Sequence, residues 1–138
     1  MTTPLASTVS MDETLIALRK ILASHPYIHF AMLFGSVALG SARPDSDIDI
    51  AVLGQVPLTT QQKIGLIEEI ALTIGRPVDL IDLKTAGEPL IGEILKGKRI
   101  IGSNDDFAGL LTRHLLDVAD FVPLQQRILR ERREQWIS

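Results

Sequence analysis

The stretch that decides the fold is residues 33–53, LFGSVALGSARPDSDIDIAVL. It begins at the end of a short apolar segment, residues 28–34, which has the length of a β-strand and stops at a Gly-Ser pair. Ten residues after that pair, Asp47 and Asp49 open a second apolar segment that runs to residue 53. We therefore expect two strands joined by an exposed loop at residues 40–46, which lies over any site formed at this end.

The pair Gly35-Ser36 is suited to a phosphate group. Glycine lets the backbone turn sharply and approach a ligand without a Cβ in the way. Ser36 then begins a short helix, whose first N–H groups and positive dipole end attract phosphate and whose hydroxyl adds a donor. Taken alone, the pair is a weak signal and is more typical of an ordinary turn.

Asp47 and Asp49 are two residues apart, so on a strand both carboxylates point to the same face. The apolar residues between and after them take the opposite face and enter the core. Carboxylate oxygens at this separation suit Mg²⁺ or Mn²⁺, which leave coordination positions for water and phosphates. The alternative interpretation is a solvated strand end that carries two charges.

A third carboxylate interrupts another apolar run, residues 77–83, at Asp79. An acid inside a strand is costly unless it is paired or metal-bound. If this strand lies beside the one that begins at Asp47, Asp79 completes a cluster of three acids, as a metal ligand or as a base. Asp82 falls on the other face, and we interpret it as structural or solvated.

Basic and imidazole side chains give weaker indications. Arg43 lies in the 40–46 loop, where it can contact the phosphates or simply be exposed. Four other cations are candidate triphosphate partners or solvated surface charges: Lys63, Lys96, Lys98 and Arg99. The three histidines are too far apart in the sequence to indicate a metal cluster, and we assign them no role.

Taken together, these residues resemble the signature of the polymerase-β-like nucleotidyltransferases. The fuller string at residues 35–52, GSVALGSARPDSDIDIAV, is similar to the minimal nucleotidyltransferase branch of that family. The segment around Asp79 is similar to the third-acid strand of the same branch. The resemblance covers residues 10–102, and the combined pattern is far more specific than its parts.

The resemblance implies transfer of AMP from ATP, held by two Mg²⁺ ions, to an acceptor hydroxyl, with pyrophosphate as the leaving group. It assigns the triphosphate to Gly35 and Ser36 and the metals to Asp47 and Asp49. Asp79 would join the second metal and serve as base. It also implies a polymerase-β-like α/β fold.

Small chains of this branch are often antitoxins that modify a tyrosine of a HEPN-domain ribonuclease toxin, so the resemblance implies such a partner in a toxin–antitoxin system. Two alternatives stay open. One is transfer to a small-molecule hydroxyl, as in aminoglycoside-modifying relatives. The other is an antitoxin that acts by binding alone.

Composition limits the class of protein. The 138 residues are 46% hydrophobic, with a mean hydropathy of +0.22 and a formal net charge of −3. This length predicts one domain with a substantial core, and the acidic balance argues against direct nucleic-acid binding. There is no cysteine, no apolar run of membrane-spanning length and no signal-peptide pattern in residues 1–10, so we expect a cytoplasmic protein.

The rest of the sequence predicts a mixed sheet of three to four strands with flanking helices. Expected domain boundaries are a loose arm at 1–10, a nucleotidyltransferase domain at 11–102 and a helical C-terminal extension at 103–138. Helices are expected at 11–24, 60–74 and 88–96, and a short edge strand at 98–101. Within 60–74 the inward residues are expected to be Ile64, Ile67, Ile70, Ala71 and Ile74.

The C-terminal extension carries two apolar stripes at helical spacing. One includes Leu111, Leu115 and Val118, and the other includes Phe107 and Leu110. Pro123 is expected to kink or divide this helix. The stripes predict either a helix packed on the sheet with a charged, solvated tail or an exposed docking surface for a helical partner.

Overall fold

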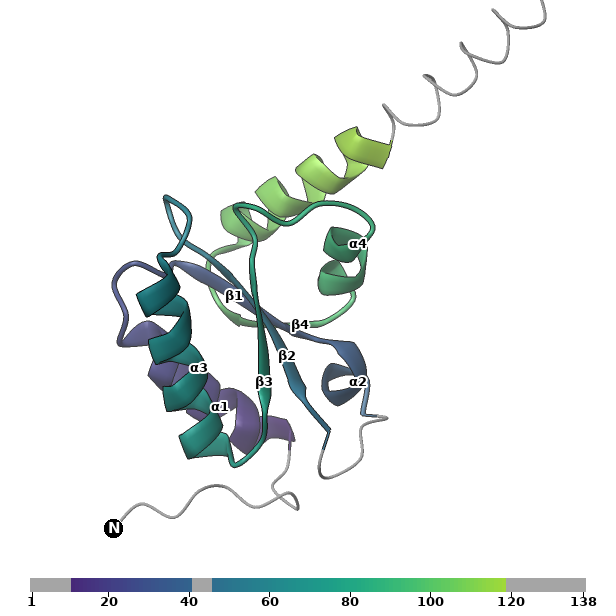
Figure 1. Ribbon diagram of the computed structural model, residues 1–138. Helices are drawn as coiled ribbons and strands as arrows, with labels where there is room; N and C mark the ends of the chain where they lie inside the picture. Colours follow the sequence, from purple (N-terminus) through teal and green to yellow (C-terminus); the bar gives the residue numbers. More distant parts are fainter. Residues whose placement is uncertain (1–10, 41–45, 119–138) are drawn as a thin grey trace, which may run out of the picture.

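The computed structural model describes residues 11–40 and 46–118. Its elements, shown in Figure 1, are α1 (Met11–Ala23), β1 (Phe30–Phe34), α2 (Gly35–Ala38), β2 (Ile48–Leu53), α3 (Thr60–Ile74), β3 (Val78–Asp82), α4 (Leu90–Leu95) and β4 (Lys98–Ile101). Residues 104–118 form a further helix. Each element expected within these ranges is present, with ends that differ by a few residues.

The strands form one mixed sheet in the order β3-β2-β1-β4. β1 is antiparallel to both β2 and β4, whereas β2 and β3 are parallel. The parallel pair is made possible by α3, which connects the two strands across one face of the sheet (Figure 1). The expected α/β architecture with a mixed sheet and flanking helices is confirmed.

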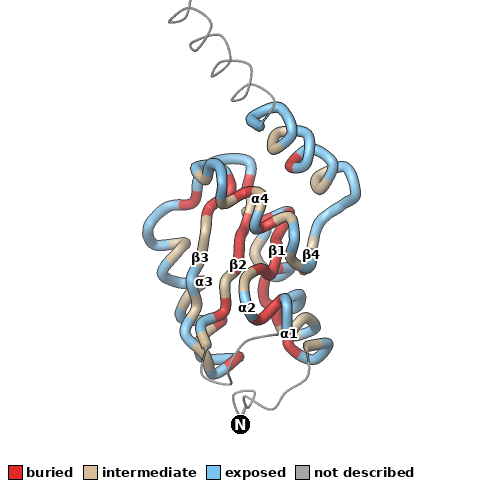
Figure 2. Tube along the Cα trace, turned by 90° about the vertical axis from the view of Figure 1, so that its right-hand side faces the viewer, coloured by how far each residue is buried: buried red, intermediate tan, exposed pale blue. Residues whose placement is uncertain are grey.

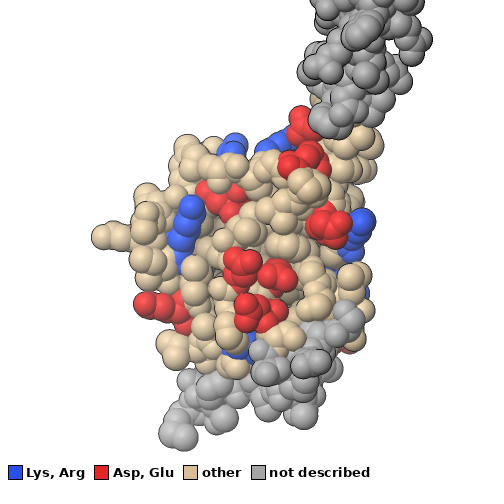
Figure 3. Space-filling view, turned by 45° about the vertical axis from the view of Figure 1, so that its right-hand side comes forward, with Lys and Arg blue, Asp and Glu red and all other residues tan. Residues whose placement is uncertain are grey.

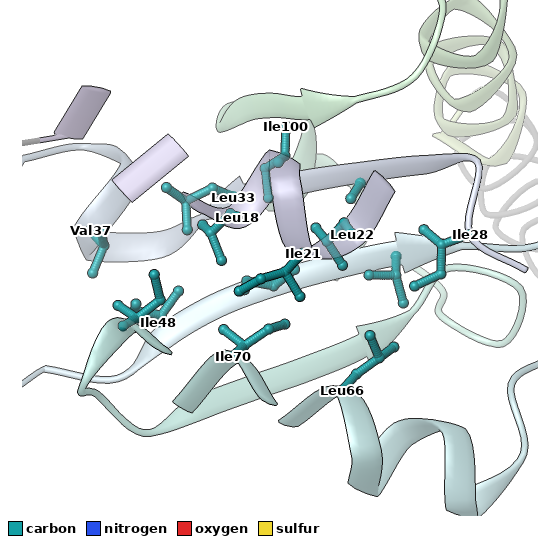
Figure 4. Close-up of a cluster of buried hydrophobic side chains, with 14 of the residues drawn as sticks. Leu18, Ile21, Leu22, Ile28, Leu33, Val37, Ile48, Leu66, Ile70 and Ile100 are labelled. Atoms are coloured by element: carbon teal, nitrogen blue, oxygen red, sulfur yellow. The ribbon is translucent and has the colours of Figure 1, made fainter. Parts of the chain in front are cut away.

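One face of the sheet packs against α1 and α3. This core holds the alternate residues Ile48, Ile50 and Val52 of β2, all fully buried, together with Leu33 of β1. Figure 4 shows how side chains of the two helices meet them. Because successive strand residues face opposite ways, burial of these positions assigns the residues between them to the other face.

The other face packs against α4 and the helix at 104–118. Its buried side chains include Phe30, Met32 and Ala51 of the strands and Leu110 of the C-terminal helix. At the end of this face nearest α2, the apolar layer gives way to carboxylates. The candidate site lies there.

α3 begins and ends as its sequence indicates. The Thr59 hydroxyl accepts a hydrogen bond from Gln62 N–H (3.1 Å), and the Gln62 side chain accepts one from Thr59 N–H (2.9 Å). Gly75 ends the helix in the left-handed conformation, with φ of 78°. This reciprocal capping box and the glycine C-cap set the two ends of the helix that connects β2 to β3.

The buried face of α3 was only partly predicted. Ile70 and Ile74 are buried as expected, but Ile64 is 50% exposed and Leu66 is fully buried in its place. Apolar residues surround more than half of this helix, so periodicity alone does not select one face. The packing of α3 against α1 and β3 makes the choice.

Thr59→Ala is expected to destabilise the protein by about 1 kcal/mol, because it leaves an N-terminal N–H of α3 without its acceptor. Urea unfolding monitored by circular dichroism measures the change as a lower midpoint at constant slope. Thr60→Ala, one residue on and inside the helix, is the matched control and should be neutral or slightly stabilising. Equal effects of the two changes would contradict the capping assignment.

The helix at 104–118 packs with one stripe and exposes the other. Leu110 is buried and Phe107 is partly buried against the sheet, whereas Leu111, Leu115 and Val118 are 39%, 57% and 46% exposed. Figure 2 shows this helix as mainly exposed beside the buried strands. The expected packing on the sheet is thus seen for one stripe within the described residues, whereas a docking role for the exposed stripe stays a prediction. Pro123 and the tail lie outside these residues.

No helix within residues 11–40 and 46–118 combines the length and apolar character that a bilayer crossing requires. The expected N-terminal arm at residues 1–10 lies outside the described ranges.

Candidate nucleotidyltransfer site

Three acids converge from neighbouring strands. Asp49 of β2 lies directly opposite Asp79 of β3 in the parallel register, and Asp47 immediately precedes β2. Neighbouring strands lie about 4.8 Å apart, so the backbones place Asp49 and Asp79 side by side. Asp49 is half-buried, and Asp47 and Asp79 are exposed. Acidic side chains gather on the face of the molecule shown in Figure 3.

The core dictates which way these acids point. Ile48 and Ile50 on β2, and Val78 and Leu80 on β3, pack toward α1 and α3. Asp49 and Asp79 alternate with them and so lie on the opposite face, on the α4 side. Burial of the aliphatic residues thus holds two like charges next to each other, an arrangement that is unfavourable for the charges themselves.

Burial and neighbouring charges both act on Asp49. Burial of its carboxyl raises its pKa above the usual value, and the neighbouring carboxylates of Asp79 and then Asp47 raise the pKa further. Each effect disfavours the ionised form. A carboxylate whose charge is disfavoured in this way is one that a cation would stabilise, and such perturbed groups concentrate at functional sites.

Gly35 forms the other wall of the site. The last residue of β1, Phe34, pairs with Asp49, and the chain turns at once into α2 through Gly35, whose φ is 75°. A Cβ added at Gly35 would lie 2.2 Å from Asp49 Oδ2. Glycine is therefore required both for the left-handed backbone and for contact with the carboxylate. Ser36 is exposed beside it.

The donor set fits a divalent cation by its chemistry. Three carboxylates on one face supply the hard oxygens that Mg²⁺ prefers, and the raised pKa of Asp49 reports negative charge that a cation would offset. In the part of the chain that the structure describes, no three acidic or histidine side chains stand close enough together to coordinate one ion as placed. Asp47 and Asp79 are exposed, so their side chains can rotate toward Asp49.

Asp82 is structural and not solvated. Its side chain accepts hydrogen bonds from Leu58 N–H (2.8 Å) and Lys84 N–H (2.9 Å), and it is 5% exposed. It ties the segment before α3 to the end of β3. Of the two sequence interpretations, the structure selects the first.

The candidate cations are not gathered at the acids by any contact in the described residues. Lys96 pairs with Glu93 (3.2 Å), and the Arg99 guanidinium donates to Asn104 Oδ1 (2.9 Å) and lies over the Phe107 ring. Arg43 lies outside the described residues.

Sequence reasoning missed Arg113. Its guanidinium donates to Leu83 O (2.8 Å) and to Ala86 O, and so attaches the helix at 104–118 to the loop after β3. Its acceptors are backbone carbonyls about 30 residues away, which no local sequence pattern reveals.

Comparison with known proteins agrees with this geometry. A family model described as "Polymerase beta, Nucleotidyltransferase" matches residues 17–107, which contain β1–β4, Gly35 and all three acids. The chain belongs to this nucleotidyltransferase family. The expectation drawn from residues 35–52 and Asp79 is thus confirmed at the level of the family.

Part of this chain is also similar in sequence to an individual member of the family. A curated relative, protein adenylyltransferase MntA of Shewanella oneidensis, is 34% identical over 82 residues. That match spans 59% of this chain and 59% of the relative.

Among solved structures, a toxin–antitoxin with AMP-PNP superposes with a TM-score of 0.70 at 25% identity, covering 88% of this chain and 98% of the other. The Shewanella oneidensis MNT antitoxin in complex with its tri-AMPylated HEPN toxin gives the same TM-score and coverage at 23% identity, a likeness of fold.

Proposed function

We propose that this protein is an adenylyltransferase that transfers AMP from ATP to a hydroxyl, on a tyrosine, of a HEPN-domain toxin and thereby acts as its antitoxin. The observation that carries the proposal is the side-by-side placement of Asp49 and Asp79, with the Asp49 carboxylate against Gly35. The similarity to protein adenylyltransferase MntA and to a toxin–antitoxin structure with an ATP analogue supports the acceptor class.

In this mechanism Gly35 and Ser36 hold the triphosphate, because the absence of a Cβ lets the backbone N–H groups approach it. Arg43 is proposed as a further triphosphate contact. Asp47 and Asp49 would hold two Mg²⁺ ions, with Asp79 on the second. Bound there, the ions would supply charge neutralisation for the attacking and leaving oxygens.

Asp79 is also the proposed base. It accepts the proton of the acceptor hydroxyl while that oxygen attacks the α-phosphorus. A bond forms between the acceptor oxygen and the α-phosphorus. The bond between the α-phosphorus and the oxygen that bridges it to the β-phosphate breaks, and pyrophosphate leaves with that electron pair. Positioning of the reactants and neutralisation of charge account for most of the rate acceleration of such a transfer, so a small domain suffices to catalyse it.

The proposal predicts that ATP labelled at the α-phosphate, with Mg²⁺ and the HEPN protein encoded beside this chain, places label on that protein. ATP labelled at the γ-phosphate should leave it unlabelled, which distinguishes nucleotidyl from phosphoryl transfer. The Asp47→Asn, Asp49→Asn double variant is the catalytic control. A folded wild-type protein that transfers no label would contradict the proposal.

The same assay separates the alternatives. If the double variant still neutralises the toxin in cells, neutralisation is by binding and not by AMPylation. If label appears on a small hydroxyl compound and never on the protein partner, the acceptor class is wrong although the transfer chemistry stands.

A further inference from the structure

A groove of about 700 Å³ runs between α4 and the helix at 104–118, on the same side of the sheet as the candidate site. It is lined from the α4 side by Glu88, Glu93 and Lys96 and from the C-terminal helix by His114, Asp117 and Val118. Nothing in the proposed transfer chemistry uses these residues. A role for the groove must therefore be sought outside the transfer step.

The groove is built in place by specific contacts. His114 Nδ1 lies 2.6 Å from Glu88 Oε1, across its floor. Arg113 donates to the carbonyl oxygens of Leu83 and Ala86, and Leu110 is buried against the sheet. The helix at 104–118 is thus attached to the domain on one side, while its other side is left exposed.

That exposed side is apolar along the groove. Leu111, Leu115 and Val118 are spaced at i, i+4 and i+7, so they share one face of the helix. Leu115 is 57% exposed and Val118, which lines the groove, is 46% exposed. Clustered exposed aliphatic side chains beside a groove are typical of a protein-binding surface.

One end of the groove lies near β1, the strand that ends at the candidate site. Lys96 lines the groove, and the next residue, Gly97, lies against the end of β1: a Cβ at Gly97 would be 2.0 Å from Leu33 O. β1 continues through Phe34, the partner of Asp49, to Gly35. A segment bound in the groove would therefore approach the reacting groups from the α4 side.

The charges of the groove select the kind of segment. Three acids, Glu88, Glu93 and Asp117, line it against a single lysine, Lys96, which pairs with Glu93 (3.2 Å). This balance repels a nucleic acid and attracts Lys or Arg.

We propose that this groove and the adjoining Leu111–Leu115–Val118 face dock the acceptor protein, through an amphipathic segment that carries basic side chains beside its apolar ones. This inference rests on the proposed function for the identity of the acceptor. Docking here holds the acceptor while its hydroxyl reaches the acids, so the groove determines affinity for the acceptor and not the chemical step.

Leu115→Asp tests the proposal, with Leu116→Asp as a matched control. The two leucines are 57% and 58% exposed, and Leu116 lies off the groove-side stripe. We expect Leu115→Asp to raise the KM for the HEPN partner at least about tenfold with little change in kcat at saturating partner. Leu116→Asp should resemble the wild type. An unchanged KM in the Leu115→Asp variant would overturn the proposal that the groove docks the acceptor, without affecting the proposed transfer activity.

Binding measured by calorimetry in the Asp49→Asn background separates this inference from the proposed function. If the wild type transfers no label but Leu115→Asp still weakens partner binding and Leu116→Asp does not, the docking surface stands and the chemistry fails. If neither change weakens binding, the docking surface fails.

Two other possible occupants of the groove, this chain's own residues and a second copy of the chain, would be detected in the isolated protein. A lower melting temperature of Leu115→Asp relative to Leu116→Asp, without partner, would mean that this chain's own residues cover the groove. Loss of self-association in Leu115→Asp alone, measured by sedimentation, would mean that a second copy covers it. Either result would overturn the proposal.

Charge reversal provides an independent check. Glu93→Lys should weaken partner binding, most strongly at low salt, because the groove loses a negative charge and gains a positive one. Glu68→Lys makes the same change on the exposed part of α3, away from the groove, and should leave binding unaltered. Equal effects of both changes would show only a dependence on net charge and would contradict a localised acidic groove.

Discussion

Asp49→Asn is expected to lower AMP transfer by at least about a thousandfold while making the folded protein more stable. The loss of activity follows because the amide cannot replace a charged oxygen in neutralising the transferring phosphates. The gain in stability follows because burial of the Asp49 carboxyl raises its pKa, and the neighbouring carboxylates of Asp79 and Asp47 raise the pKa further. Removing one of the three charges relieves the repulsion, a change that commonly adds about 0.5–2 kcal/mol.

The stability gain should depend on pH. Because the pKa of Asp49 is higher in the folded than in the unfolded chain, the folded state is penalised once the carboxyl ionises. The difference in melting temperature between Asp49→Asn and the wild type should therefore be small near pH 3.5 and grow as pH rises toward about 7. Differential scanning calorimetry across this range measures it, and acids remote from Asp49 cancel in the comparison.

Adding Mg²⁺ tests whether Asp49 contributes to cation binding. Millimolar Mg²⁺ should raise the melting temperature of the wild type more than that of Asp49→Asn, because ligand binding to the folded state stabilises it. A variant that is both less active and less stable than the wild type at every pH would show that Asp49 serves the fold and not the site.

Gly35→Ala is expected to reduce transfer by at least about a hundredfold through displacement of a single carboxylate. The added Cβ would lie 2.2 Å from Asp49 Oδ2, so the Asp49 side chain must rotate away. Misplacing a reacting group by about 1 Å can cost this much in rate. The φ of 75° adds a backbone penalty of about 1–2 kcal/mol. Steady-state kinetics and urea unfolding measure the two effects.

Gly65→Ala separates these effects from a general intolerance of glycine replacement. Gly65 lies within α3, where an added Cβ would contact nothing within 4 Å. Alanine there should stabilise the protein by about 0.5–1 kcal/mol and leave transfer unchanged. If Gly35→Ala also proved neutral, Gly35 would not be part of the site.

Much of the candidate site was predictable because its signals are local. A strand that ends at glycine, two acids at alternate positions and an apolar run between them specify their own conformation within a few residues. Gly35 makes the sharp turn that its place in the sequence predicted, with a φ of 75°, and Asp49 lies on the face opposite Ile48 and Ile50. Resemblance to a family then connected the two elements.

Other features were not predictable because they depend on which segments meet. Leu66, and not Ile64, enters the core, since α3 has apolar residues on several sides and only its neighbours choose among them. In the same way, the two stripes of the helix at 104–118 were equal in the sequence, and only Phe107 and Leu110 met the sheet.

The sequence by itself determined the strands, the capping of α3, the turn at Gly35 and the face on which Asp49 lies, since each depends on residues close together along the chain. Only the tertiary structure placed Asp79 opposite Asp49, because that pairing depends on the register of two parallel strands separated by an entire helix. It also gave Asp82 its buried amide partners and left Leu115 uncovered beside a groove. These outcomes follow from long-range packing, which selects among local arrangements that the sequence leaves nearly equal in energy.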